Sequence, residues 1–304
     1  MNGPLLVFAQ RNGAPIHIRE VVSGRQRDCF CPACGQSLIA KKGDQLGHHF
    51  AHDSGSSCSF ESAFHLIAKQ LLHERITRAI AARAKLEFHW GCEECQEYHE
   101  GNLLKSAASV HLEQFIGEVR PDLLLRAASG DPIAAIEVVV THAPEKAALK
   151  FYRWNRIAVL QIRVDTARDL ERLHNGTPLR ATRCSVCKNP KCHECGFNKN
   201  TRYVRVESSP CYACRRPMRI AEAVCCGASF LPEQLTQEEE ALARQHGCIL
   251  KVCYSKTLDR SYLANVCEHC GRFVGNQHLM TSGAPRTQVW IGTSGYYCTR
   301  CGTW

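Results

Sequence analysis

The chain has 304 residues, of which 44% are hydrophobic and 22% are charged, and its formal net charge is +9. These values are typical of a soluble globular protein with room for one domain of ordinary size and a smaller second unit. No apolar run reaches the roughly 18 residues that a membrane helix needs, and the first residues lack the cationic head and long apolar core of a signal peptide. We therefore expect a cytoplasmic protein with no membrane partner.

The positive charge is concentrated in the C-terminal part of the chain. Residues 1–180 contain 22 Lys and Arg against 20 Asp and Glu, whereas residues 181–304 contain 16 against 9. A basic tail indicates a polyanionic partner, most simply nucleic acid, although a merely soluble basic surface has the same composition.

The 20 cysteines indicate zinc rather than disulfides, because thiols stay reduced in the cytoplasm. Cysteines three residues apart occur repeatedly, and such C-x2-C knuckles place two thiolates on one side of a tight turn for tetrahedral Zn²⁺. The seven pairs are Cys31/Cys34, Cys92/Cys95, Cys184/Cys187, Cys192/Cys195, Cys211/Cys214, Cys267/Cys270 and Cys298/Cys301. We expect three or more structural zinc ions.

Residues 1–56 are predicted to form a β-hairpin and a zinc knuckle. Two alternating stretches, LLVFAQ and IHIREVV, flank the turn RNGAP, as in a hairpin. The segment CPACGQSLIAKKGDQLGHHFAH can close one Cys2His2 site with four ligands: Cys31, Cys34, His49 and His52. His48 competes with His49, and Cys29 and Cys58 are spare thiols.

Residues 57–178 are predicted to form an α/β core. The longest helical pattern, SFESAFHLIAKQLLHERITRAIAARAKLEF, has an apolar stripe that would face this core. Glu61, His65 and Lys69 share one flank of the helix. Ser59 could cap the helix, in which case the three ionisable groups could also be a solvated edge.

The order of elements after this helix indicates a sheet with at least one parallel pair. Three strands are predicted in SVHLEQFIGE, RPDLLLRAA and IAAIEVVV, followed by a helix from about Pro144 to Trp154 and the strand IAVLQIRV. A helix that connects two strands usually leads into a parallel neighbour.

Residues 179–304 are predicted to form a cysteine-rich zinc-binding domain whose folding depends on metal. We expect one site to be local in sequence, formed by Cys184, Cys187, Cys192 and Cys195. A second site would join Cys211, Cys214, Cys267 and Cys270. The pair Cys298/Cys301 would then join Cys92/Cys95 or another pair.

Asp122 and Glu137 are the candidate catalytic acids. They lie in successive predicted strands joined by a turn near residues 129–131, so both can reach one Mg²⁺ (or Mn²⁺). Such an ion can activate water and neutralise charge during phosphodiester hydrolysis. Glu137 interrupts an apolar strand, where an ionised carboxylate is costly unless it is paired or bound to metal. A salt bridge to a nearby arginine is the alternative.

Five motifs in this order, CPACG, KKGDQLGHHFAH, ESAFHLIAK, RPDLLL and IEVVVTH, resemble the competence-protein CoiA-like family, a branch of the PD-(D/E)XK nuclease superfamily. The resemblance covers roughly residues 5 to 165. It implies a restriction-endonuclease-like α/β core with a mixed sheet and a nucleic-acid substrate. Asp122 and Glu137 then match the two metal-binding acids, Glu61 matches an acid that many members carry on the first core helix, and Glu113 is a weaker candidate.

The sequence departs from the superfamily at Val139, where many members have a lysine. Side chains alternate along a strand, so Thr141 would share the face of Val139, and His142 would point away unless the strand ends first. Thr141 is therefore the candidate local polar group. The missing cation would come from Lys69 on the first helix or from Lys146 on the following one.

These observations predict a metal-dependent nuclease, acting on DNA more than on RNA, with zinc modules that provide structure and bind nucleic acid. One alternative is a catalytically inactive nuclease-like scaffold that binds nucleic acid. Another is a zinc module that serves as a platform for protein partners. Salt separates the two alternatives, because the affinity of a scaffold that binds nucleic acid through its phosphates would fall steeply as the salt concentration rises.

Overall fold

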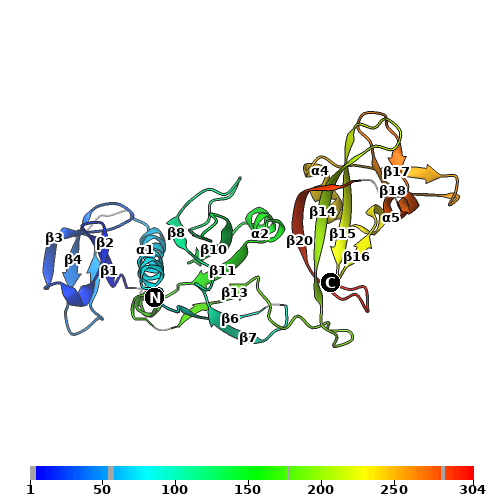
Figure 1. The fold of residues 1–304 in the computed structure, drawn as a ribbon. Coiled ribbons are helices and arrows are strands. Elements are labelled where there is room, and N and C mark those ends of the chain that lie inside the picture. The colour runs from blue at the N-terminus through cyan, green and yellow to red at the C-terminus, as the bar shows by residue number, and fades with distance from the viewer. Residues whose placement is uncertain (1–4, 54–57, 93, 177, 282–284) are drawn as a thin grey trace. The chain divides into compact units, whose positions relative to one another are not determined.

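The structure is a computed structural model, shown in Figure 1, which describes residues 5–53, 58–92, 94–176, 178–281 and 285–304. The chain forms two compact units. Unit 1 comprises Met1–Tyr152 and Ile157–Lys188, and unit 2 comprises Arg153–Arg156 and Asn189–Trp304.

The boundary between the units differs from the predicted one at residues 178/179. Strand β12 (Leu179–Ala181) pairs with β6 (Glu87–Gly91), and β13 (Arg183–Cys184) pairs with β11 (Ala158–Arg163), both of unit 1. The C-terminal segment of unit 2 therefore begins ten residues later than predicted, at Asn189. The other predicted boundary, near residue 56, lies outside the described residues.

An N-terminal five-stranded sheet has the order β2-β1-β3-β4-β5. Its strands are β1 (Phe8–Arg11), β2 (Ala14–His17), β3 (Gly24–Phe30), β4 (Ser37–Lys41) and β5 (His49–Ala51), with a short 3-10 helix η1 (Ile18–Glu20) after β2. The predicted hairpin is β1–β2. Its turn residues Asn12 and Gly13 have φ of 52° and 81°, as a two-residue turn that matches the twist of its strands requires.

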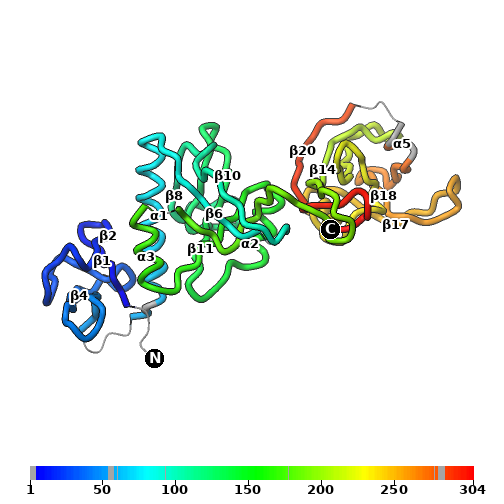
Figure 2. The backbone as a smooth tube through the Cα atoms, turned by 90° about the horizontal axis from the view of Figure 1, so that it is seen from below, coloured from blue at the N-terminus to red at the C-terminus, as the bar shows by residue number. Residues whose placement is uncertain are grey.

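Helix α1 (Phe60–Ala81) is the long predicted helix. It starts at Ser59, whose side chain accepts a hydrogen bond from the Ser62 N–H, a cap typically worth about 1 kcal/mol. The tube in Figure 2 shows α3 (Ala167–His174) alongside α1. Arg75 of α1 joins the two helices, because its Nη1 donates to the carbonyl of Leu173 at 3.2 Å.

The central sheet of unit 1 has the order β13-β11-β10-β9-β8. Its other strands are β8 (Ser109–Leu112), β9 (Leu123–Arg126), β10 (Pro132–Val139) and β11 (Ala158–Arg163). β10 and β11 are parallel and joined through α2 (Lys146–Trp154), whereas the remaining pairs are antiparallel. The predicted mixed α/β arrangement is confirmed.

The core of this sheet is apolar and fully enclosed. All three leucines of β9, Leu123 to Leu125, have no exposed surface. Burying such a side chain contributes about 2 kcal/mol, so β9 is held rigidly at the point where Asp122 precedes it. A separate three-stranded sheet, β12-β6-β7, contains β6 (Glu87–Gly91) and β7 (Tyr98–Asn102).

Unit 2 contains two sheets, with the orders β16-β15-β14-β20 and β17-β18-β19. The first consists of β14 (Asn200–Pro210), β15 (Pro217–Cys225), β16 (Ala228–Phe230) and β20 (Thr287–Tyr297), and the second of β17 (Ile249–Ser255), β18 (Arg260–Val266) and β19 (Phe273–Val274). The helices are η2 (Pro232–Gln234), α4 (Gln237–Gln245) and α5 (Asn276–Thr281).

A buried ion pair links sheet and helix in unit 2. The Arg202 guanidinium on β14 donates two 3.0 Å hydrogen bonds to the Glu239 carboxylate on α4. The rings of Phe230, Tyr297 and Trp304 lie 4.3–5.3 Å from the guanidinium carbon. Removing one partner of such a pair leaves an uncompensated buried charge, which costs about 3–5 kcal/mol.

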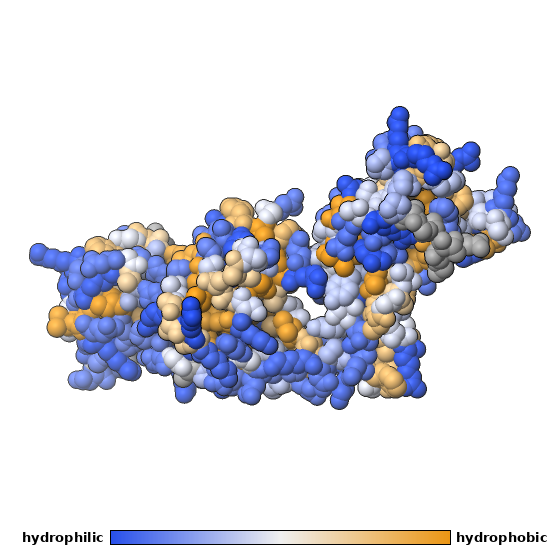
Figure 3. Space-filling model, viewed as in Figure 1, coloured by the Kyte–Doolittle hydropathy of each residue, from blue (hydrophilic) through white to orange (hydrophobic). Residues whose placement is uncertain are grey.

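The face of the molecule drawn in Figure 3 is mainly hydrophilic, with hydrophobic residues in smaller patches. None of the helices in the described part of the chain is both long and apolar enough to cross a membrane.

Candidate active site and zinc centres

The two candidate acids lie next to each other on neighbouring strands. Antiparallel pairing sets Ile136 of β10 opposite Leu123 of β9, so the next residue, Glu137, lies beside Asp122 at the start of β9. The predicted convergence of Asp122 and Glu137 at one place on the sheet is therefore what the register produces.

Asp122 is held as a carboxylate by three neighbours. Its Oδ2 accepts hydrogen bonds from the Val138 N–H at 2.8 Å and from His65 Nε2 at 3.0 Å, and Lys69 Nζ lies 3.5 Å from its Oδ1. Burial alone would raise the pKa of Asp122, but these hydrogen bonds and positive charges together lower it. Asp122 is thus ionised at neutral pH.

Glu137 has the opposite environment. Burial, together with the charge of Asp122, raises its pKa to about 7, although the Tyr152 hydroxyl donates a 2.7 Å hydrogen bond to Glu137 Oε1. Tyr152 on α2 is completely buried and packs with Ala135 of β10. The site therefore contains one carboxylate that is charged and one that is close to its titration point at neutral pH.

Lys69 places a positive charge next to Asp122. Its ammonium group, with only 6% of the side chain exposed, pairs with both Asp122 and Glu113. Lys146, the other predicted candidate, is exposed on α2 and has no ion pair with a described residue. Of the two lysines, only Lys69 lies beside the acids.

Glu113 follows β8 and adopts a left-handed backbone, with φ of 47°. This conformation is uncommon for residues other than glycine and costs about 1 kcal/mol. The Glu113 N–H donates to the Asp122 carbonyl at 3.0 Å, and Arg120 Nη1 lies 3.8 Å from its carboxylate. Glu113 is therefore fixed beside Asp122.

Thr141 does not continue the face of Val139, contrary to the expectation from strand alternation. β10 ends at Val139, so the alternation stops before Thr141. Its hydroxyl donates to Glu61 on α1, and His142 Nδ1 lies 3.2 Å from the same Glu61 carboxylate. Glu61, Thr141 and His142 form a small exposed cluster next to the acids rather than joining them.

His65 and Tyr152 were not predicted as site residues. His65 lies one turn from both Glu61 and Lys69 on α1, so its place on that flank was a usable signal. No sequence signal marks Tyr152, because its contact with Glu137 depends on how α2 packs on β10.

The acids do not form a compact donor set. In five groups of described residues, three or more metal-ligating side chains have all their donor atoms within 4.8 Å of one another. Neither Asp122 nor Glu137 belongs to such a group. One such group, Glu87, His89 and Glu100 on β6 and β7, has two exposed acids.

Within the described residues, four cysteine-rich groups could each hold a zinc ion, and none of the 20 cysteines forms a disulfide. Tetrahedral coordination with a Zn–S distance near 2.3 Å separates two sulfurs by about 3.8 Å. In three of these groups, sulfur pairs lie 3.6–3.7 Å apart, which fits shared coordination and is far longer than the S–S bond of about 2.05 Å.

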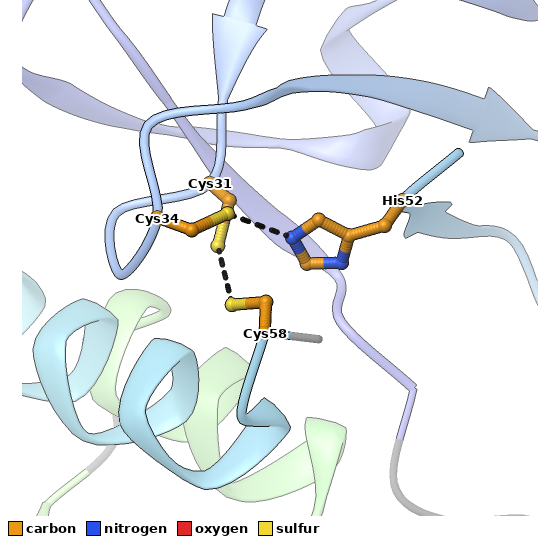
Figure 4. Close-up of side chains that lie close together, drawn as sticks. All are labelled: Cys31, Cys34, His52 and Cys58. Carbon is orange, nitrogen blue, oxygen red and sulfur yellow. Dashed lines mark hydrogen bonds between the residues drawn. The ribbon is translucent and has the colours of Figure 1, made fainter. Parts of the chain in front are cut away.

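The first group contains Cys31, Cys34, His52 and Cys58, drawn in Figure 4. Cys31 Sγ lies 3.6 Å from Cys58 Sγ, and Cys34 Sγ lies 3.3 Å from His52 Nε2. The predicted ligand His49 lies outside this group, and its Nδ1 is 2.8 Å from the Gly47 carbonyl oxygen. The spare thiol Cys58, just before α1, occupies the place that was expected for His49.

The second group contains Cys92, Cys95, His99 and Cys187. Cys95 Sγ lies 3.2 Å from His99 Nε2. The Cys92/Cys95 knuckle therefore meets Cys187 rather than Cys298/Cys301. His99 was not predicted, and its position on β7 beside β6 brings it next to the knuckle.

The third group corrects the predicted local site. Cys192 and Cys195 combine with Cys298 and Cys301 rather than with Cys184 and Cys187. The cause is the pairing of Asn200 on β14 with Tyr297 on β20, which brings the C-terminal knuckle back to the one before β14. Cys184 on β13 is outside these groups, and burial raises the pKa of its thiol to about 11.

The fourth group contains Cys211, Cys214, Cys267 and Cys270, the set that the sequence predicted. Two Sγ pairs across the knuckles, Cys211 with Cys270 and Cys214 with Cys267, are 3.7 Å apart. The expectation of three or more sites able to hold zinc is confirmed.

Comparison with known proteins finds similarity at the N-terminus. Residues 16–61 match the family model of the competence protein CoiA, N-terminal domain. The chain is 43% identical over 53 residues to the competence protein CoiA of Bacillus subtilis (strain 168), a stretch that covers 16% of this chain and 14% of that protein. No solved structure matches. The expected CoiA-like resemblance is confirmed for this segment, which contains the first zinc group but neither Asp122 nor Glu137.

Proposed function

We propose that this chain, CoiA-like in its N-terminal segment, is a Mg²⁺-dependent nuclease on a restriction-endonuclease-like core, acting on DNA in preference to RNA. The observation that supports this most is the position of Glu137 beside Asp122, with Lys69 Nζ 3.5 Å from Asp122. Two acids and a buried lysine around one strand end are the groups that phosphodiester hydrolysis needs.

The donor chemistry fits Mg²⁺ (or Mn²⁺), which prefers carboxylate oxygens. Asp122 is already ionised, and a pKa near 7 makes Glu137 easy to ionise when a cation compensates its charge. When bound, such an ion lowers the pKa of water and offsets charge on the phosphoryl oxygens.

The remaining groups hold the acids and balance their charge. His65 and the Val138 N–H orient Asp122, and Tyr152 orients Glu137. The Lys69 ammonium would stabilise negative charge that develops next to Asp122. The exposed cluster of Glu61, Thr141 and His142 can contact the substrate or assist a second ion.

A second candidate function is nucleic-acid binding by an inactive scaffold. It is favoured by Val139 and by the absence of Asp122 and Glu137 from the compact donor groups among the described residues. In both cases the zinc groups provide structure, and the basic C-terminal module binds nucleic acid or a protein partner. Binding to nucleic acid would weaken steeply with salt.

The test is to incubate the zinc-loaded protein with plasmid, linear duplex DNA, single-stranded DNA and RNA in Mg²⁺, in Mn²⁺ and without either ion. We expect ion-dependent cleavage of at least one DNA substrate. Equal ion-independent cleavage, or binding to nucleic acid with no cleavage of any substrate, would favour the second candidate.

A further inference from the structure

Unit 2 contains a pocket of about 320 Å³ beside the fourth zinc group. Its walls come from the knuckle before β15, the β17–β18 turn, β18, β19 and the start of α5. Six of its lining residues carry the argument: Tyr212, Thr257, Tyr262, Phe273, Asn276 and His278.

Aromatic rings dominate the pocket. The rings of Tyr212 and His278 lie 5.4 Å apart with an angle of 56° between their planes, and those of Tyr262 and Phe273 lie 6.3 Å apart at 87°. Tyr212 keeps 45% of its surface exposed. Exposed aromatic faces are the surfaces on which nucleobases stack, and such stacking tolerates any base.

Unused polar groups line the same pocket. Asn276 is 8% exposed, and its Nδ2 donates to Glu233 at 2.9 Å, but its Oδ1 is buried with no hydrogen-bond partner. An unpaired buried acceptor is unfavourable, and an incoming N–H group would satisfy it. The Tyr262 hydroxyl accepts from the Asn276 N–H at 3.4 Å and has no acceptor of its own among the described residues. An acceptor and a donor therefore match the edge of a base.

Basic side chains flank the pocket in sequence. Arg215 and Arg216 follow the knuckle of Tyr212, Lys256 precedes Thr257, and Arg272 precedes Phe273. All four are exposed and form no ion pair with a described residue. Exposed cations this close in sequence to the pocket-lining residues favour a ligand with a phosphate backbone over an uncharged aromatic ligand.

We propose that this pocket binds one unstacked base of a single-stranded nucleic acid, with the flanking phosphates on the neighbouring arginines and lysine. This inference rests on the proposed function only in taking nucleic acid as the polyanion, and the pocket would bind a base whether or not the protein cleaves the strand. Unit 2 would therefore be the part of the chain that binds the unstacked base.

The fourth zinc group holds residues that adjoin the pocket lining. Tyr212 lies between the ligands Cys211 and Cys214, and Val274 and Leu279 belong to the same buried cluster as Cys211 and Cys267. These two residues are the neighbours of Phe273 and His278. Zinc removal would therefore disorder the stacking surface.

The experiment measures the anisotropy of a labelled oligothymidylate, an oligouridylate and a DNA duplex with the full zinc-loaded chain in Mg²⁺-free buffer. Tyr212→Ala is expected to weaken binding of the single strands about tenfold, whereas Tyr212→Phe retains it. Duplex binding should change less than twofold. The oligothymidylate and oligouridylate arms show whether DNA or RNA is preferred.

Tyr254→Ala is the matched control, because Tyr254 is an exposed tyrosine of the same unit, 56% exposed, that does not line the pocket. It should bind like the wild type. Equal losses in Tyr212→Ala and Tyr254→Ala, no loss in Tyr212→Ala, or no single-strand binding by the wild type would overturn the proposal. Because neither Mg²⁺ nor Mn²⁺ is present, each of these results is independent of whether the protein cleaves nucleic acid.

Discussion

At the scale of single residues, the pKa values of the two neighbouring carboxylates are shifted in opposite directions. Asp122 meets His65, Lys69 and a backbone N–H, which lower its pKa, whereas burial and the neighbouring charge raise the pKa of Glu137 to about 7. Under the proposed function, a proton and the metal ion would compete for Glu137 near neutral pH.

The first prediction concerns stability in Mg²⁺-free buffer. The folded protein holds a proton on Glu137 up to about pH 7, whereas the unfolded chain releases it near its ordinary pKa of about 4.3, so stability falls as pH rises between these values. In urea unfolding, the wild type should lose about 3 kcal/mol between about pH 4 and pH 8 relative to Glu137→Gln.

Mg²⁺ should reverse part of this loss at about pH 8 in the wild type but not in Glu137→Gln. Parallel pH profiles for the two proteins without Mg²⁺ would show that Glu137 titrates normally and is not buried as described.

The second prediction concerns Lys69. Lys69→Met should reduce nuclease activity at least about 100-fold, because removing one preorganised charge from a site of this kind typically has an effect of this size. Lys146→Met, the matched change on an exposed helix, should retain full activity. Loss of activity in Lys146→Met, with full activity in Lys69→Met, would place the catalytic cation on α2.

Several residues of the candidate site could be proposed from sequence and others could not. Asp122 and Glu137 interrupt predicted strands, and Lys69 lies on the helix flank of Glu61, so short-range patterns were enough to propose them. Thr141 was placed wrongly, because alternation applies only while a strand continues and the end of β10 at Val139 has no sequence marker.

At the scale of elements, strand pairing decides which knuckles meet. The set Cys211, Cys214, Cys267 and Cys270 was predicted as one of the possible pairings of knuckles. The partner of the Cys192 knuckle could not, because it depends on the antiparallel pairing of β14 with β20, nearly 100 residues later. Spacing reveals a knuckle, whereas its partner is a property of the fold.

The third prediction concerns the first zinc group. Cys58→Ser should lose about one equivalent of zinc per chain and lower the melting temperature, because a structural site contributes folding free energy. His49→Ala should keep the wild-type zinc content. Native mass spectrometry of both variants checks this, and zinc loss in His49→Ala alone would restore the predicted Cys2His2 set.

At the scale of the whole molecule, each unit contains two of the four zinc groups. Cys187 and Cys192 are five residues apart, yet they belong to groups in different units. The composition and the cysteine spacing predicted a metal-dependent molecule with a basic module, but the unit boundary followed β12 and β13, whose pairing no local pattern showed.

The central claim is that Asp122 and Glu137 form an ion-dependent phosphodiesterase site. The most direct measurement is the rate at which wild type, Asp122→Ala and Asp131→Ala nick supercoiled plasmid in Mg²⁺, at equal zinc content. Asp131 is an exposed acid in the turn before β10. We predict nicking by wild type and Asp131→Ala and none by Asp122→Ala, whereas equal rates in all three proteins would contradict the assignment.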